Sequence, residues 1–115
     1  MAVQIYCNKK NFDVQKAERF FKERKVPYQL IDLKKHKLGK RELELFILKA
    51  GSAEKLIDRN NKQTNTHPVA LVFTEELIKN AMLEDASCLI TPIIRNGNQV
   101  IIGFDEKICL SWLKG

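Results

Sequence analysis

The chain alternates between short runs typical of strands and longer segments with apolar residues at helical spacing. Its first part predicts a strand over 2–7, a helix over 12–24 and a strand over 28–33, because β-forming runs bracket a segment whose apolar residues recur every three to four positions. Asn11 precedes this helix as an N-cap residue, and Pro27 ends it. A helix between two strands predicts a parallel strand pair with a right-handed crossover.

The middle of the chain favours helices joined by loops. A helix is predicted over 40–50, and Ser52 is the N-cap candidate of a short helix that runs through Ile57. The polar stretch 58–66 is predicted as a loop. A further helical pattern covers 69–82, although its opening Val-Ala-Leu-Val-Phe is also compatible with a strand.

The clearest local signal lies near the end of the chain. Two β-branched runs, 93–95 and 99–102, flank Asn96-Gly97, and Asn-Gly is the preferred pair for a tight type I′ hairpin. Asp105 then caps a last helix. The whole order, βαβ, then helices, then ββα, predicts an α/β protein with a thioredoxin-like mixed sheet and inserted helices.

Composition narrows the class of protein. With 115 residues the chain fits a single domain over 1–115. Hydrophobic residues make up 44% and charged residues 30%, the balance of a globular protein rather than a disordered tail. Its apolar runs are far too short for a membrane span, and no basic segment followed by an apolar stretch opens the chain. We therefore expect a location in the reducing cytoplasm.

Positive charge is concentrated in the first half of the chain. The net charge is +6, and residues 1–62 carry 16 Lys and Arg against 8 Asp and Glu, whereas residues 63–115 carry 4 against 6. A basic region of this kind can bind nucleic acid, an anionic partner or an acidic small molecule, or its charges can simply lie on solvated helix faces. The lysine-rich segment 34–41 has no interleaved aromatic residues and matches no nucleic-acid motif, so nucleic-acid binding is not expected.

Cysteine and histidine usage argues against metal and disulfide chemistry. The three cysteines are widely separated and form no CxxC, which excludes a disulfide scaffold and a zinc site. His36 and His67 have no second ligand at metal spacing, so no metal is predicted. Cys88 and Cys109 are expected in the core. Cys7 ends the first strand, where a small buried thiol is the ordinary outcome.

Two segments carry a resemblance to a known family. The opening IYCNKKNFDVQKAERFFKERKVPYQLIDL and the closing TPIIRNGNQVIIGFDE resemble the arsenate reductase-like (ArsC) family, which includes the Spx regulators and glutathione-linked relatives. The resemblance implies a thioredoxin fold whose nucleophilic cysteine sits at the start of the first helix, where the helix dipole favours a thiolate. In this sequence that position falls on Asn11, and the second cysteine of the Spx-type pair would fall on Val14.

The resemblance also implies which residues surround a ligand. Arg59 matches the arginine that helps to hold an oxyanion, and Thr91 stands where arginine is common. Pro92 matches the proline that thioredoxin-like folds hold in the cis form, which leaves the Thr91 backbone open to an extended peptide or to a thiol ligand such as glutathione. Lys10 and Asn11 add a positive charge and an amide at the helix start, which together predict an anion site.

Two functions stay open on these residues. The first is a non-catalytic binding or regulatory module for glutathione, a small anion or a protein partner; Spx-type relatives contact RNA polymerase, so a transcriptional role belongs to this class. The second is a thiol oxidoreductase, arsenate reductase-like or glutathione-linked, with Cys7 recruited as the nucleophile. Because the amide of Asn11 cannot form a thiolate, attack arsenic or form a mixed disulfide, the sequence favours the binding module.

Overall fold

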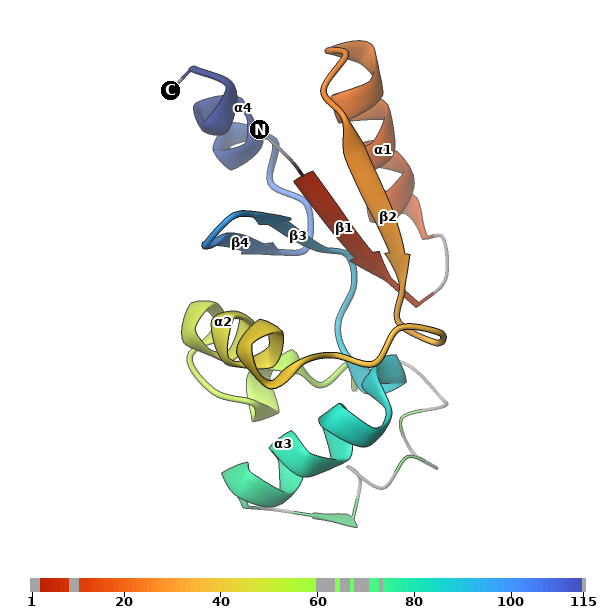
Figure 1. The fold of residues 1–115 in the computed structure, drawn as a ribbon, viewed down its shortest axis with the longest axis vertical. Helices are drawn as coiled ribbons and strands as arrows, with labels where there is room; N and C mark the ends of the chain where they lie inside the picture. Colours follow the sequence, from red (N-terminus) through yellow and green to blue (C-terminus); the bar gives the residue numbers. More distant parts are fainter. Residues whose placement is uncertain are drawn as a thin grey trace.

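A single mixed sheet organises the part of the chain that the structure, a computed structural model, describes: residues 3–8, 11–59, 64, 67, 71–72 and 74–114. The strand order is β2-β1-β3-β4 (Figure 1). β1 (Val3–Cys7) runs parallel to β2 (Tyr28–Asp32) and antiparallel to β3 (Ile93–Asn96). β3 continues through a tight turn into β4 (Gln99–Ile102).

Helices cover both faces of this sheet (Figure 1). On one face lie α1 (Phe12–Glu23) and α4 (Glu106–Lys114). On the other lie α2 (Lys40–Ala50) and α3 (Glu75–Glu84), with the short 3₁₀ helices η1 (Glu54–Leu56) and η4 (Ala86–Cys88). The predicted α/β mixed sheet with inserted helices is confirmed.

Side-chain alternation along β1 builds a separate core on each face. Val3 and Ile5 pack with Phe21 in the core under α1 and α4. Tyr6 points to the opposite face and packs with Phe46 in the core under α2 and α3. This period of two is what a strand buried on both faces requires, and it fixes the end of β1 between the two helical layers.

The C-terminal hairpin forms where it was predicted, but its turn is one residue later. Asn96 belongs to β3 and pairs with Gln99, so the two turn residues are Gly97 and Asn98 rather than Asn96 and Gly97. Gly97 has φ +62°, and among the described non-glycine residues only Lys25 has a positive φ. A positive φ at the first turn position alone is the pattern of a type II′ turn, which prefers glycine there, so the type I′ prediction is wrong.

The middle of the chain departs from the prediction in two places. The short helix expected to run to Ile57 is the 3₁₀ helix η1, which spans only Glu54–Leu56. α3 begins at Glu75 rather than at 69, because the Thr74 hydroxyl accepts a hydrogen bond from the Leu77 N–H (3.3 Å) and caps the helix there. Residues 60–63, 65–66, 68–70 and 73 lie outside the described residues, so the predicted loop over 58–66 and the helix-or-strand alternative over 69–73 stay predictions for those positions.

Candidate functional site

Asn11 connects the start of α1 to the segment before β3. Its Oδ1 accepts a hydrogen bond from the Val14 N–H (2.8 Å), which caps the helix as the sequence predicted. Its Nδ2 donates to the carbonyl oxygen of Thr91 (3.3 Å). The Thr91–Pro92 peptide bond is cis, as the resemblance implied. The structure therefore brings together three of the predicted site residues, Asn11, Thr91 and Pro92.

A second asparagine, Asn8, fixes the neighbouring backbone. Its Nδ2 donates to the carbonyl oxygens of Ser87 (2.8 Å) and Leu89 (3.2 Å). Its Oδ1 is buried and has no hydrogen-bond partner among the described residues. Asn8 is not among the predicted site residues, because the carbonyls that it binds are about eighty positions away in the chain. The two asparagines thus connect the end of β1 and the start of α1 to the segment before β3.

Backbone donors are available beside this contact. The first two N–H groups of α1, those of Phe12 and Asp13, have no partner within the helix, as for any helix start. Within the described residues neither of them, nor the N–H of Thr91, donates a hydrogen bond. Donors at a helix N-terminus favour an anionic or carbonyl-bearing ligand, whereas the carboxylate of Asp13 in the first turn competes for the same positive end.

The two predicted cationic residues are placed differently. Arg59 directly follows the segment that pairs with the approach to β3, since the Asp58 N–H donates to the Cys88 carbonyl oxygen (2.8 Å). Its side chain is 60% exposed, and Nη2 lies 3.8 Å from Glu54 Oε1, so its nearest charged contact is η1 rather than Asn11. Lys10 lies outside the described residues, and its predicted role at the helix start stays a prediction.

All three thiols are buried, and none is in a disulfide. Cys7 is 5% exposed at the end of β1, and Cys88 and Cys109 are 1% and 0% exposed, as expected of core residues. Burial raises the pKa of Cys88 to about 12 and that of Cys109 to about 11. Because a thiolate is the reactive form, Cys88 and Cys109 are poorly suited to nucleophilic chemistry near neutral pH.

We expect the native protein to react slowly with a thiol reagent such as dithionitrobenzoate at pH 7. Because the thiols are buried, the three together should react at least about 100-fold more slowly than in urea, where all become accessible. Stopped-flow absorbance measures both rates. Cys7→Ser should leave the native rate unchanged. A fast native phase that disappears in Cys7→Ser would instead support Cys7 as a recruited nucleophile.

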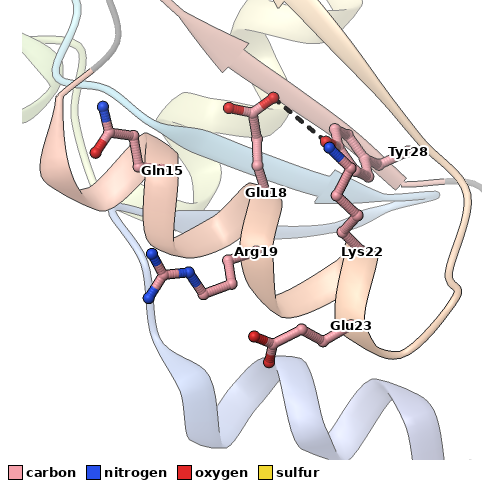
Figure 2. A pocket seen from close by; sticks show the side chains of 6 residues that line it. All are labelled: Gln15, Glu18, Arg19, Lys22, Glu23 and Tyr28. Atoms are coloured by element: carbon pink, nitrogen blue, oxygen red, sulfur yellow. Dashed lines mark hydrogen bonds between the residues drawn. The ribbon is translucent and has the colours of Figure 1, made fainter.

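A separate hollow lies along the outer face of α1, away from Asn11. It measures about 600 Å³ and lies between the helix and Tyr28 (Figure 2). The Tyr28 hydroxyl donates to Glu18 (3.3 Å) across it. Its charged side chains balance, two acidic against two basic: Glu18 and Glu23, Arg19 and Lys22. The hollow thus has no charge preference, and the polar contacts that bear on the predicted chemistry lie at the start of α1.

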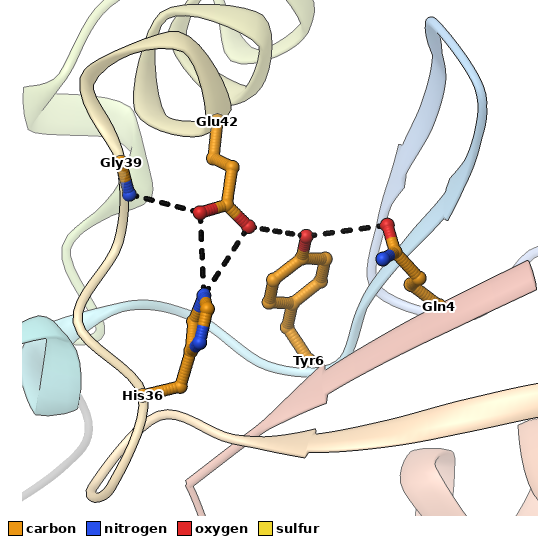
Figure 3. Close-up of polar contacts among 5 residues, drawn as sticks. All are labelled: Gln4, Tyr6, His36, Gly39 and Glu42. Carbon is orange, nitrogen blue, oxygen red and sulfur yellow. Dashed lines mark hydrogen bonds and ion pairs between the residues drawn. The ribbon is translucent and has the colours of Figure 1, made fainter.

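Figure 3 shows a polar network centred on Glu42, at the sheet face covered by α2. Glu42 accepts hydrogen bonds from the Tyr6 hydroxyl (2.6 Å) and the Gly39 N–H (2.8 Å), and His36 Nε2 lies 3.2 Å from its Oε1. Burial of Glu42 opposes its ionised form, but these hydrogen bonds outweigh burial and lower its pKa. Burial and the bond to Glu42 raise the pKa of Tyr6 to about 12, although the guanidinium of Arg95 acts in the opposite direction.

Sequence reasoning missed this network. The local part of it was detectable, because a glutamate three residues after the N-cap Gly39 is the acidic half of a capping box. The contact with Tyr6 was not detectable, since it depends on how α2 crosses the sheet. No group of three or more described His, Cys, Asp or Glu side chains is arranged to hold a metal ion, and His67 Nε2 instead lies 2.7 Å from the Asp85 carbonyl oxygen.

The fold and the site together define a class of protein. A β1-α1-β2 unit followed by β3-β4-α4, with a cis proline before β3 tied to the start of α1, is the arrangement of a thioredoxin-like protein. None of the described helices is long and apolar enough to cross a bilayer.

Comparisons with known proteins make the fold more specific. No family model and no curated protein sequence matches the chain. Among solved structures, the YFFB protein aligns with a TM-score of 0.77 and 20% identity over 95% of this chain and 96% of its own. An arsenate reductase (ArsC) related protein from Brucella melitensis aligns with a TM-score of 0.66 and 23% identity over 100% of this chain and 97% of its own. An arsenate reductase from Vibrio cholerae aligns with a TM-score of 0.71 and 16% identity over 87% of each chain. The chain has the fold of the ArsC-related proteins, which confirms the predicted fold.

Proposed function

We propose that this protein is an ArsC-fold binding module that works without the nucleophilic thiol of arsenate reductases. Asn11 carries the proposal, because it occupies the helix start where a reactive cysteine would gain its low pKa and uses both ends of its amide in hydrogen bonds. Its two bonds stabilise the helix start and the Thr91 carbonyl at once. The burial of all three thiols agrees with a role other than thiol turnover.

The ligand that suits this site bears carboxylate or another anionic group. The N–H groups of Phe12, Asp13 and Thr91 supply donors, and the helix dipole favours negative charge. Reduced glutathione fits this chemistry through its carboxylates and peptide groups, and a small oxyanion fits it through its charge alone. A peptide segment of a protein partner, such as the polymerase subunits that Spx-type relatives contact, is the larger counterpart of the same ligand class. The protein itself is expected to act in the cytoplasm.

A titration of the ¹⁵N-labelled protein tests this proposal. Reduced glutathione, S-methylglutathione and sulfate serve as probes, and the amide resonances of Phe12, Asp13 and Thr91 serve as the readout. S-methylglutathione should bind as well as glutathione, because no thiol exchange is involved. Asn11→Ala should weaken binding about three- to tenfold by loosening the helix start, and Asp13→Asn should strengthen it by removing a competing charge.

Asn98→Ala, in the exposed hairpin turn, is the matched control and should leave binding unchanged. If none of the probes shifts these three amides at about 10 mM, a concentration that detects even very weak binding, a small anionic ligand is ruled out at this site. If glutathione binds but S-methylglutathione does not, the thiol itself takes part, and the oxidoreductase alternative gains support over the binding module.

A further inference from the structure

β4 lies at an end of the sheet with one side open. β3 is its neighbour on one side, and no described strand pairs with the other. In a two-residue hairpin the residues that flank the turn form a hydrogen-bonded pair, and such pairs alternate from there. Gln99 and Ile101 therefore bond to β3, whereas the N–H and C=O groups of Val100 and Ile102 point to the open side. An edge of this kind can accept another strand.

Apolar side chains from two helices flank this edge. α2 contributes Leu45 and Leu48, and α4 contributes Ile108 and Trp112, around an open hollow of about 410 Å³ beside Val100. A second hollow shares Leu48 with it and a third shares Ile108, so the depression continues along β4. Leu48 is 81% exposed. We call this surface the β4 groove, defined by the edge of β4 and these four side chains.

The charged side chains at the rim of the β4 groove indicate the charge of its binding partner. Its charged side chains are mostly basic: Arg41, Lys49, Lys55 and Arg95 against Glu44 and Asp105. An acidic segment is attracted to such a rim. A second copy of this chain would bring the same basic rim against itself, and the like charges would oppose the contact.

We propose that the β4 groove binds an extended acidic segment of a partner protein, which adds to the sheet as a strand beside β4. The segment's backbone would bond to Val100 and Ile102, its apolar residues would cover Leu48 and Trp112, and its carboxylates would face the basic rim. Backbone bonds supply affinity in this mode of recognition, and alternate side chains supply specificity. The β4 groove does not include Asn11, so this inference stands apart from the ligand site at the start of α1.

Trp112 offers a direct readout, because it is the single tryptophan of the chain and lies in the groove. The probe is a pool of nine-residue peptides with apolar residues at alternate positions and Glu or Asp between them. We expect this pool to change Trp112 emission and to shift the Val100 and Ile102 amides below about 1 mM. A pool with Lys in place of the acids should bind at least tenfold more weakly. N-methylation of the alternate backbone nitrogens of the peptide that would bond to β4 should abolish its binding.

Two matched variants complete the test. Leu48→Glu adds a negative charge to an exposed position of the groove and should weaken binding of the acidic pool at least tenfold, whereas Leu77→Glu, at a 48% exposed position on α3, should not change it. Asn11→Ala should also leave it unchanged. Equal binding of both pools, or no shift of Val100 and Ile102 with either, would overturn the proposal. A dimer seen by sedimentation that Leu48→Glu dissociates would assign the groove to a second copy and overturn it as well.

Discussion

Replacing Asn11 with cysteine is expected to create a reactive thiol in a protein whose own three thiols are buried. The new side chain would stand at the N-cap of α1, next to the N–H groups of Phe12 and Asp13. A cysteine at a helix N-terminus has its pKa lowered from about 8.5 into the range of about 3.5–7.5, so between about a quarter and nearly all of it is thiolate at pH 7. The thiolate fraction should rise about eightfold to thirtyfold above that of an ordinary exposed cysteine, and the rate of reaction with dithionitrobenzoate should rise by about threefold at most, because a thiolate of lower pKa is a weaker nucleophile.

The reference for this measurement is Asn98→Cys, the same substitution in the exposed hairpin turn, where no helix lies ahead of the thiol. The pH dependence of iodoacetamide alkylation gives the pKa of each new thiol. Asn11→Cys should also lose about 1 kcal/mol of stability, because the cap bond to Val14 is removed. If the thiols at positions 11 and 98 titrate at the same pH, the helix start does not activate a thiol, and the predicted effect of the helix N-terminus is contradicted.

Comparing the disulfide-reduction activity of Asn11→Cys with that of the natural chain also tests whether the rest of the site supports catalysis. A gain of glutathione-coupled disulfide reduction by Asn11→Cys would show that the Thr91–Pro92 side of the site is still competent, and that only the residue at position 11 sets the class of function. If Asn11→Cys reacts with thiol reagents but does not reduce disulfides, the contacts that hold an oxyanion are the part that is not competent, since Arg59 is exposed and lies against Glu54.

The fold was largely predictable because its signals are local. The alternation of β1, the spacing of Val14, Ala17 and Phe21 on α1, and the β-branched runs of the hairpin each need only a few neighbouring residues. The turn was misplaced by one residue because Asn-Gly and Gly-Asn both occur in the sequence at 96–98, and the cross-strand register decides between them. The choice depends on the register between β3 and β4, which the preference of the Asn-Gly pair alone does not determine.

The site was predictable only in part, for the same reason. Asn11 is an N-cap residue by local rules, and the structure adds that its other amide group reaches Thr91, eighty positions later. The role of Asn8 and the contact between Tyr6 and Glu42 depend on how distant segments pack, so no local pattern predicts either of them. Arg59 was matched by resemblance alone, and its side chain contacts a nearer acidic residue.

Removing the carboxylate at Glu42 is expected to be the most destabilising of the polar substitutions considered. Glu42→Ala deletes the bond to the Gly39 N–H and leaves the buried Tyr6 hydroxyl without its 2.6 Å acceptor. The hydroxyl keeps only its longer contact to Gln4 Oε1 (3.4 Å), and the loss of the two hydrogen bonds to the carboxylate costs about 2–4 kcal/mol. Urea unfolding followed by circular dichroism measures this loss. Glu44→Ala, on the exposed side of the same helix, is the control and should change stability by less than about 0.5 kcal/mol.

A double-mutant cycle with Tyr6→Phe isolates the contact itself. Tyr6→Phe should cost about 1–2 kcal/mol, and the double variant should cost at least about 1 kcal/mol less than the sum of the two single changes, because the second change removes a bond that is already broken. Additive costs would contradict the coupling and reduce Glu42 to a helix cap.

The pH dependence of stability offers an independent check on the same pair, because the two groups act at opposite ends of the scale. The pKa of Glu42 is lower in the folded protein than in the unfolded chain, so its contribution is complete above the ordinary carboxyl pKa and is lost as the pH falls through the folded value. The pKa of Tyr6 is raised from 10.0 to about 12, so its contribution is complete below pH 10 and is lost as the pH rises toward 12. Tyr6→Phe should therefore flatten the alkaline loss of unfolding free energy, and Glu42→Ala the acidic one. If both variants keep the natural profile, other groups control the pH dependence, and the Tyr6–Glu42 contact contributes through packing alone.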